Sequence, residues 1–322
     1  MALPTRYMIV QRSLGSASVP PQDANTEEYT YVASALDIAF ALLSTEKVKA
    51  TMVYVARFFD QTVTEVPRIF ADASDAVVSA RINSFIEALR GQMPLIVIDG
   101  RLTDQRIPAY HPRGIWSGNF NPSDQMIVLN KSLVDSMVGA VNTSGLFRRF
   151  QFQFANIFLH EIGGHLLFTY LYDGRPMTPP QMMPLSWSGQ AQPGSSEPAG
   201  ESGRFLEDVL LQGTLEFFDT PQVSSAWIVD ADGNAKRVTM QAIDTAVINR
   251  SFTLPYPTAN PLTNVSSLIA SQGRLEVART AGQTERHFIA RAKEQPIRFY
   301  ISRSDLRLVP NNPSVLAQKV QA

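Results

Sequence analysis

The chain has 322 residues. Its 28 Lys and Arg residues against 29 Asp and Glu residues give a net charge of −1, so its overall charge does not suggest nucleic-acid binding. It contains no Cys, which excludes disulfides, thiolate metal sites and a Cys nucleophile. We identify no secretory signal in MALPTRYMIVQRSLG and no apolar run of the roughly 18 residues that would span a bilayer, so we expect a soluble, cytoplasmic protein that does not bind membranes.

The first half of the chain alternates helical and strand patterns. Residues 1–28 are predicted to form a loose arm, because 12–28 are rich in Ser, Pro, Gln and Asn, and residues 29–322 to form a single domain. Apolar residues recur at helical spacing over 28–44 and 75–90, whereas 50–59 fits a helix or a strand. The runs PLIVIDG (94–100) and QMIVLN (125–130) predict strands, and 131–138 predicts a helix.

The second half contains a long apolar helix, predicted over 147–172. Residues 173–203 are rich in Pro and Gly and predict a loop that gates access to a site. A helix over 204–218, a β-hairpin over 225–240 around Asp232-Gly233 and a Pro-rich loop at 255–261 follow. A helix near 283–293 and a strand at 297–302 complete the prediction. The fold class is α+β, helix-rich with a small mixed sheet.

The stretch LHEIGGHLLF places His160, Glu161 and His165 inside the long apolar helix. Three ionisable groups in a buried helix are costly unless they are paired or bound to a metal. Residues five apart diverge by about 140° in an ideal helix, but a π-bulge at Gly163-Gly164 would bring both imidazoles to one face. The two histidines would then hold Zn²⁺ with a third ligand and a water, and Glu161 would accept the proton of that water.

The third zinc ligand is expected in GESGRFLEDVLLQG, residues 200–213, which offers Glu201 and Glu207. Helical phase favours Glu207, because it shares a stripe with Gly203, Leu211 and Leu215. Glu201 precedes the helix and could instead complement its dipole. The carboxylate that is not the ligand could orient a histidine.

The segment His160-Glu161-Ile162-Gly163-Gly164-His165 resembles the H-E-x-x-G-H zinc motif of the dipeptidyl peptidase III family. This resemblance, and the wider one to zincins with a Glu ligand (gluzincins), implies a zincin-like metallopeptidase domain with His160 and His165 as zinc ligands and Glu161 as catalytic base. Gly200-Glu201 is similar to the G-E-N-x-x-D segment of neprilysin-type enzymes. The arrangement with GESGRFLED is also similar to predicted fungal proteins of unknown function.

Two functions from different classes follow. The first is a zinc metallopeptidase that cleaves a peptide or protein substrate. The second is a catalytically silent zincin-like scaffold that binds a metal or a partner. The presence of Glu161 favours the enzyme, because a structural metal site has no need of that carboxylate.

Overall fold

A computed structural model describes residues 7–13, 20–64, 66–102, 108–112, 119–140, 145–172, 178–179, 201–220 and 223–264. The predicted helix near 283–293 and strand at 297–302 lie outside these residues, as does most of the predicted loop 173–203. Among the described residues, no helix is both long enough and apolar enough to cross a membrane.

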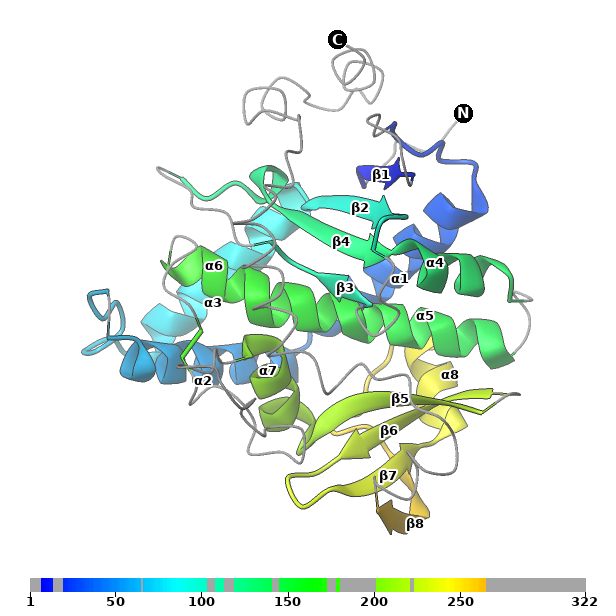
Figure 1. Cartoon of the computed structure of the whole chain (residues 1–322). Helices are drawn as coiled ribbons and strands as arrows, with labels where there is room; N and C mark the ends of the chain where they lie inside the picture. The colour runs from blue at the N-terminus through cyan, green and yellow to red at the C-terminus, as the bar shows by residue number, and fades with distance from the viewer. Residues whose placement is uncertain are drawn as a thin grey trace, which may run out of the picture.

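The first sheet has four strands in the order β1-β2-β4-β3 (Figure 1). Three strands run parallel, and the short edge strand β3 runs antiparallel to β4. All five residues of β2 are buried, which suits a strand in a parallel sheet covered on both faces. The strands are β1 (Ile9–Arg12), β2 (Leu95–Asp99), β3 (Ala109–Tyr110) and β4 (Met126–Asn130).

The prediction of a loose arm over residues 1–28 is wrong for Ile9–Arg12, which form β1 and pair with β2. Ile9 and Val10 are fully or almost fully buried. A strand of four residues carries too little periodicity to stand out from its polar flanks, so its partner β2 determines its conformation.

Helices supply most of the buried hydrophobic residues of the core. Thr26 and Thr45 accept hydrogen bonds from backbone amides and so cap α1 and α2. The segment 50–59, for which helix and strand were both open, belongs to a helix. The helices are α1 (Glu27–Leu43), α2 (Glu46–Thr62), α3 (Asp75–Gly91), α4 (Lys131–Val138) and α5 (Gly145–Phe158).

The long helix predicted over 147–172 is confirmed, and it runs between the two sheets of the molecule (Figure 1). It consists of α5, the π-helical segment η2 (Leu159–Leu166) and α6 (Leu167–Tyr172). Aromatic residues anchor it in the core, with Phe152, Phe154, Phe158 and Phe168 almost inaccessible to solvent. His111, just after β3, lies with its imidazole Nε2 3.0 Å from Thr169 Oγ1, so the edge of the first sheet contacts this helix.

The second sheet is antiparallel, in the order β5-β6-β7-β8. The predicted hairpin around Asp232-Gly233 is confirmed as β6 and β7. Helix α8, which the sequence did not indicate, packs on α5, where Arg148 pairs with Asp244 at 2.6 Å. The elements are α7 (Ser202–Leu211), β5 (Thr214–Thr220), β6 (Val223–Val229), β7 (Asn234–Val238), α8 (Met240–Asn249) and β8 (Thr258–Asn264).

Two predictions in this region are wrong. The helix predicted over 204–218 ends at Leu211, because Gln212 adopts the left-handed conformation (φ 61°) and Gly213 has φ 153°. The chain then turns into β5. Most of the loop predicted at 255–261 belongs to β8, which pairs with β7. The described residues form a mixed helix-and-sheet fold, which is consistent with the predicted α+β class. They contain two sheets, one mixed and one antiparallel, where a single small mixed sheet was predicted.

Candidate metal centre

The two histidines of the long helix face the same side, as the predicted bulge requires. The widened hydrogen bonding of η2 extends to its end, where the amide of Leu167 donates to the carbonyl of Ile162, five residues earlier. The imidazole rings of His160 and His165 lie with their centroids 5.2 Å apart. The prediction of a π-bulge around Gly163-Gly164 is therefore confirmed.

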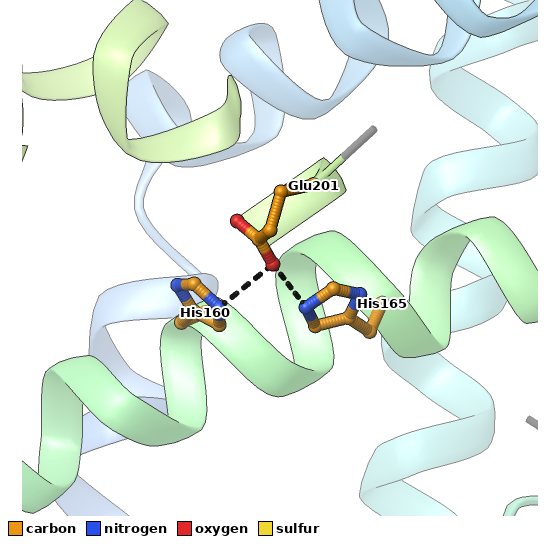
Figure 2. A group of neighbouring side chains, drawn as sticks. All are labelled: His160, His165 and Glu201. Atoms are coloured by element: carbon orange, nitrogen blue, oxygen red, sulfur yellow. Dashed lines mark ion pairs between the residues drawn. The ribbon is translucent and has the colours of Figure 1, made fainter. Parts of the chain in front are cut away.

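Glu201 brings the third side chain to this pair (Figure 2). Its Oε1 lies 3.2 Å from His160 Nε2 and 2.5 Å from His165 Nε2. One donor atom from each of the three residues falls within 4.8 Å of the others, a spacing that a single metal ion can bridge. Glu201 is also the N-cap of α7, since its Oε2 accepts a hydrogen bond from the amide of Arg204.

Glycines allow α7 to approach the π-helical segment closely. A Cβ atom on Gly164 would lie 2.4 Å from the Cα of Gly203, and one on Gly203 would lie 2.4 Å from the ring of His160. Neither distance is possible between non-bonded carbon atoms. A glycine at position 164 therefore has two functions. It permits the π-bulge, and it allows α7 to pack closely against η2.

The other imidazole nitrogens have partners of their own. His160 Nδ1 lies 2.7 Å from Glu207 Oε1, and His165 Nδ1 lies 3.0 Å from Ser202 Oγ. If Nδ1 donates in both contacts, both Nε2 atoms are unprotonated, and their lone pairs point toward Glu201. Hydrogen bonds of this kind commonly orient metal-binding histidines.

The structure groups Glu201, and not the preferred candidate Glu207, with the two histidines. The helical-phase argument assumed that the helix continued through Leu215, which belongs to β5. Glu207 instead lies behind His160, with its Oε2 accepting from Arg204 Nη1 at 3.1 Å and from the amide of Leu215 at 3.0 Å. The sequence analysis did not identify Ser202 or Arg204, whose roles depend on this packing.

Glu161 lies beside the group and is 4% exposed. Its Oε2 has no hydrogen-bond partner among the described residues, and its carboxylate accepts a hydrogen bond from the backbone amide of His111. Burial raises the pKa of Glu161 above its ordinary value, against the opposing effect of the two imidazoles. The result is a buried carboxylate with one oxygen able to accept a proton.

The pKa values of the group reflect strong coupling between imidazoles and carboxylates. Burial opposes the charged form of His160, but Glu201 and Glu207 outweigh it and raise the His160 pKa well above its usual range. Burial also opposes ionisation of Glu201, but the two imidazoles outweigh it and lower the Glu201 pKa well below its usual range. Without a metal ion, protons on the imidazoles would therefore supply the positive charge that the carboxylates need.

Three comparisons, with protein-family models, with curated proteins and with solved structures, found no match to this chain.

Proposed function

We propose that the protein is a zinc-dependent hydrolase of metallopeptidase type, with a zincin-like domain. The observation that carries the proposal is the convergence of His160, His165 and Glu201 beside the buried carboxylate of Glu161. The resemblance of the segment 160–165 to a zincin motif agrees with this arrangement, and a peptide or protein is the substrate class that it suggests.

The donor set suits Zn²⁺. Two imidazole nitrogens and one carboxylate oxygen are ligands that Zn²⁺ prefers, and three protein ligands leave one coordination position open, as in catalytic rather than structural sites. Unprotonated Nε2 atoms would direct their lone pairs at a carboxylate oxygen of Glu201 and be repelled by it. The geometry therefore needs either protons on the imidazoles or a cation between these atoms. Fe²⁺ uses a similar set of two histidines and one carboxylate, but the adjoining Glu161 favours hydrolysis.

In the proposed reaction, this chain supplies a base and holds it in place. Bound zinc would lower the pKa of a water toward about 7 and polarise the carbonyl that is attacked. Glu161 would accept the proton of that water on Oε2 and donate it to the leaving amine. The backbone amide of His111 holds the carboxylate, and burial makes it more basic than an exposed Glu.

The alternative is a catalytically silent scaffold that binds a metal or a partner. The contacts of His160 are also compatible with this alternative, because a protonated imidazole would pair with Glu201 and Glu207 without any metal. The two functions differ in metal content and in turnover, and one experiment addresses each.

Metal content is measured by elemental analysis for zinc, iron and manganese in the purified wild type and in a His160→Ala/His165→Ala variant. We expect close to one zinc per wild-type chain and none in the variant. Equal, substoichiometric zinc in both proteins would contradict the site.

Turnover is tested with Glu161→Gln, which keeps the size of the side chain and removes the basic oxygen. We expect unchanged zinc content and a fall in hydrolysis of library peptides by at least about 10²-fold, as for the loss of a general base. Full turnover by the variant would exclude this mechanism. If zinc-loaded wild type cleaves no peptide or ester, the scaffold becomes the better proposal.

A further inference from the structure

A buried charged cluster joins α7 to the first residues of β5. One nitrogen of Arg204, Nη1, lies 3.1 Å from Glu207 Oε2, 3.1 Å from Glu216 Oε1 and 3.2 Å from the carbonyl oxygen of Leu215. Arg204, Glu207 and Glu216 are 6%, 6% and 2% exposed. One guanidinium therefore links a helix to the edge strand of the second sheet in a region from which water is excluded.

This cluster reaches the metal centre through Glu207. Its Oε1 contacts His160 Nδ1 at 2.7 Å, while its Oε2 accepts from Arg204 and from the amide of Leu215. The carboxylate is held at both oxygens, so it cannot rotate without losing one set of contacts. The orientation of the His160 ring thus depends on groups that do not touch it.

The connection between α7 and β5 leaves little freedom to this arrangement. Only Gln212 and Gly213 separate the two elements, and a Cβ on Gly213 would lie 2.5 Å from the carbonyl oxygen of Val229 on β6. Any displacement of β5 would therefore move Leu215 and Glu216 relative to Arg204.

We propose that Arg204 and Glu216 are positioning residues of the metal centre and that, through them, the second sheet sets the zinc affinity of the site. The inference rests on the proposed function, because zinc is the ligand whose affinity it concerns. The sheet residues supply no metal ligand. Glu216 fixes the position of Arg204, and Arg204 and the amide of Leu215 fix the carboxylate of Glu207. Glu207 in turn orients the ring of His160.

A purely structural role makes a different prediction. Buried ion pairs contribute variably to stability, and breaking one destabilises the fold wherever it lies. The control is Arg148→Met, which removes the 2.6 Å ion pair between α5 and α8, a pair that is more exposed than the Arg204 cluster. That pair also joins the long helix to the C-terminal part of the described chain, but it is not connected to His160 by any contact described above.

The experiment compares wild type with Glu216→Gln, Arg204→Met, Arg204→Lys and Arg148→Met. The first readout is zinc affinity, measured by competition with a chelator. We expect a loss of about 10- to 100-fold for Glu216→Gln and Arg204→Met, the range seen for groups that orient metal ligands. Arg204→Lys should recover part of the loss, and Arg148→Met should leave the affinity within about twofold of wild type. Wild-type affinity in folded Glu216→Gln would overturn the inference, and this milder variant decides alone if Arg204→Met does not fold.

The second readout needs no metal. The Nδ1 proton of His160, bonded to Glu207, should give a protected NMR resonance in wild type and in Arg148→Met, and should exchange faster in Glu216→Gln. If wild type binds no zinc, the proposed function fails, while this resonance still tests the positioning. A resonance equally protected in Glu216→Gln would overturn the positioning whether or not zinc binds.

Discussion

At the scale of single residues, Glu201 combines two tasks. One carboxylate oxygen caps α7 by accepting from the amide of Arg204, and the other faces both imidazoles. Capping side chains stabilise a helix by about 1 kcal/mol. The residue that would complete the metal site therefore also fixes the beginning of the helix that carries Ser202 and Glu207.

The different places of the two glutamates predict different effects on zinc affinity. Glu201→Gln removes the charged oxygen but keeps an amide oxygen that can cap α7, so we expect a loss of zinc affinity beyond about 100-fold with a modest change in thermal stability. Glu207→Gln should cost about 10- to 100-fold, because it only orients His160. Chelator competition and thermal unfolding of both variants measure this. A larger loss for Glu207→Gln than for Glu201→Gln would return the ligand role to Glu207.

The sequence predicted the backbone conformation at the candidate site because the signals for it were local. The spacing of His160 and His165, with two glycines between, was sufficient to predict the π-helical turn that the structure contains. The choice between Glu201 and Glu207 depended on where α7 begins and ends. That boundary is determined by the backbone conformation at Gln212 and by the contact of Gly213 with β6, which are tertiary features.

At the scale of elements, segments with a clear apolar or periodic pattern were predictable, and segments without one were not. The helix over 131–138 matches α4, and the strands at 94–100 and 125–130 match β2 and β4 within a residue or two at each end. Ile9–Arg12 became a strand because β2 pairs with it, and β8 formed in a Pro-rich segment because β7 offers an edge. Pairing partners far along the chain supply what local sequence lacks.

The contact between η2 and α7 predicts a sharp difference between two Gly→Ala substitutions. At Gly164 a Cβ would lie 2.4 Å from the Cα of Gly203, so the helices must separate. We expect Gly164→Ala to destabilise the fold by about 1–3 kcal/mol or more, as overpacking does, and to weaken zinc binding. At Gly91, the last residue of α3, a Cβ would meet nothing within 4 Å.

Gly91→Ala is the matched control, and its change should be below about 1 kcal/mol and in the stabilising direction, given the helix propensity of Ala. Denaturant unfolding of both variants, with zinc affinity measured alongside, tests the pair. Equal stability of the two variants would show that α7 does not approach η2 as closely as the structure has it.

At the scale of the whole molecule, the candidate site lies where the parts of the fold meet. The long helix runs between the two sheets, α7 packs against its π-helical segment, and the turn after α7 leads into the second sheet (Figure 1). The first sheet reaches Glu161 through the backbone of His111, and the second reaches His160 through Glu207. The state of this site should therefore affect the stability of the entire fold.

This coupling predicts a pH dependence of stability that differs with and without zinc. The pKa of His160 is raised, so its protonation stabilises the metal-free fold fully below the unfolded value of about 6.5, and that contribution is lost as the pH rises through the folded pKa. The pKa of Glu201 is lowered, so its contribution is present above about 4.3 and is lost as the pH falls through its folded pKa. The metal-free protein should thus be most stable between about pH 4.3 and about pH 6.5, where both contributions are fully present.

Zinc requires the imidazoles without the protons on Nε2, so it competes with those protons and binds better as the pH rises. Its stabilisation, about 2.7 kcal/mol at a free concentration of 100 times Kd, grows as Kd falls. We therefore expect the difference in Tm between zinc-loaded and chelator-treated protein to increase from pH 6 to pH 9 at fixed free zinc. Differential scanning fluorimetry across this range measures it, with the His160→Ala/His165→Ala variant as a control that should show no zinc-dependent shift at any pH. A difference in Tm that is constant across the range in wild type would mean that zinc does not displace protons from these imidazoles, and the ion would then have to bind elsewhere on the chain.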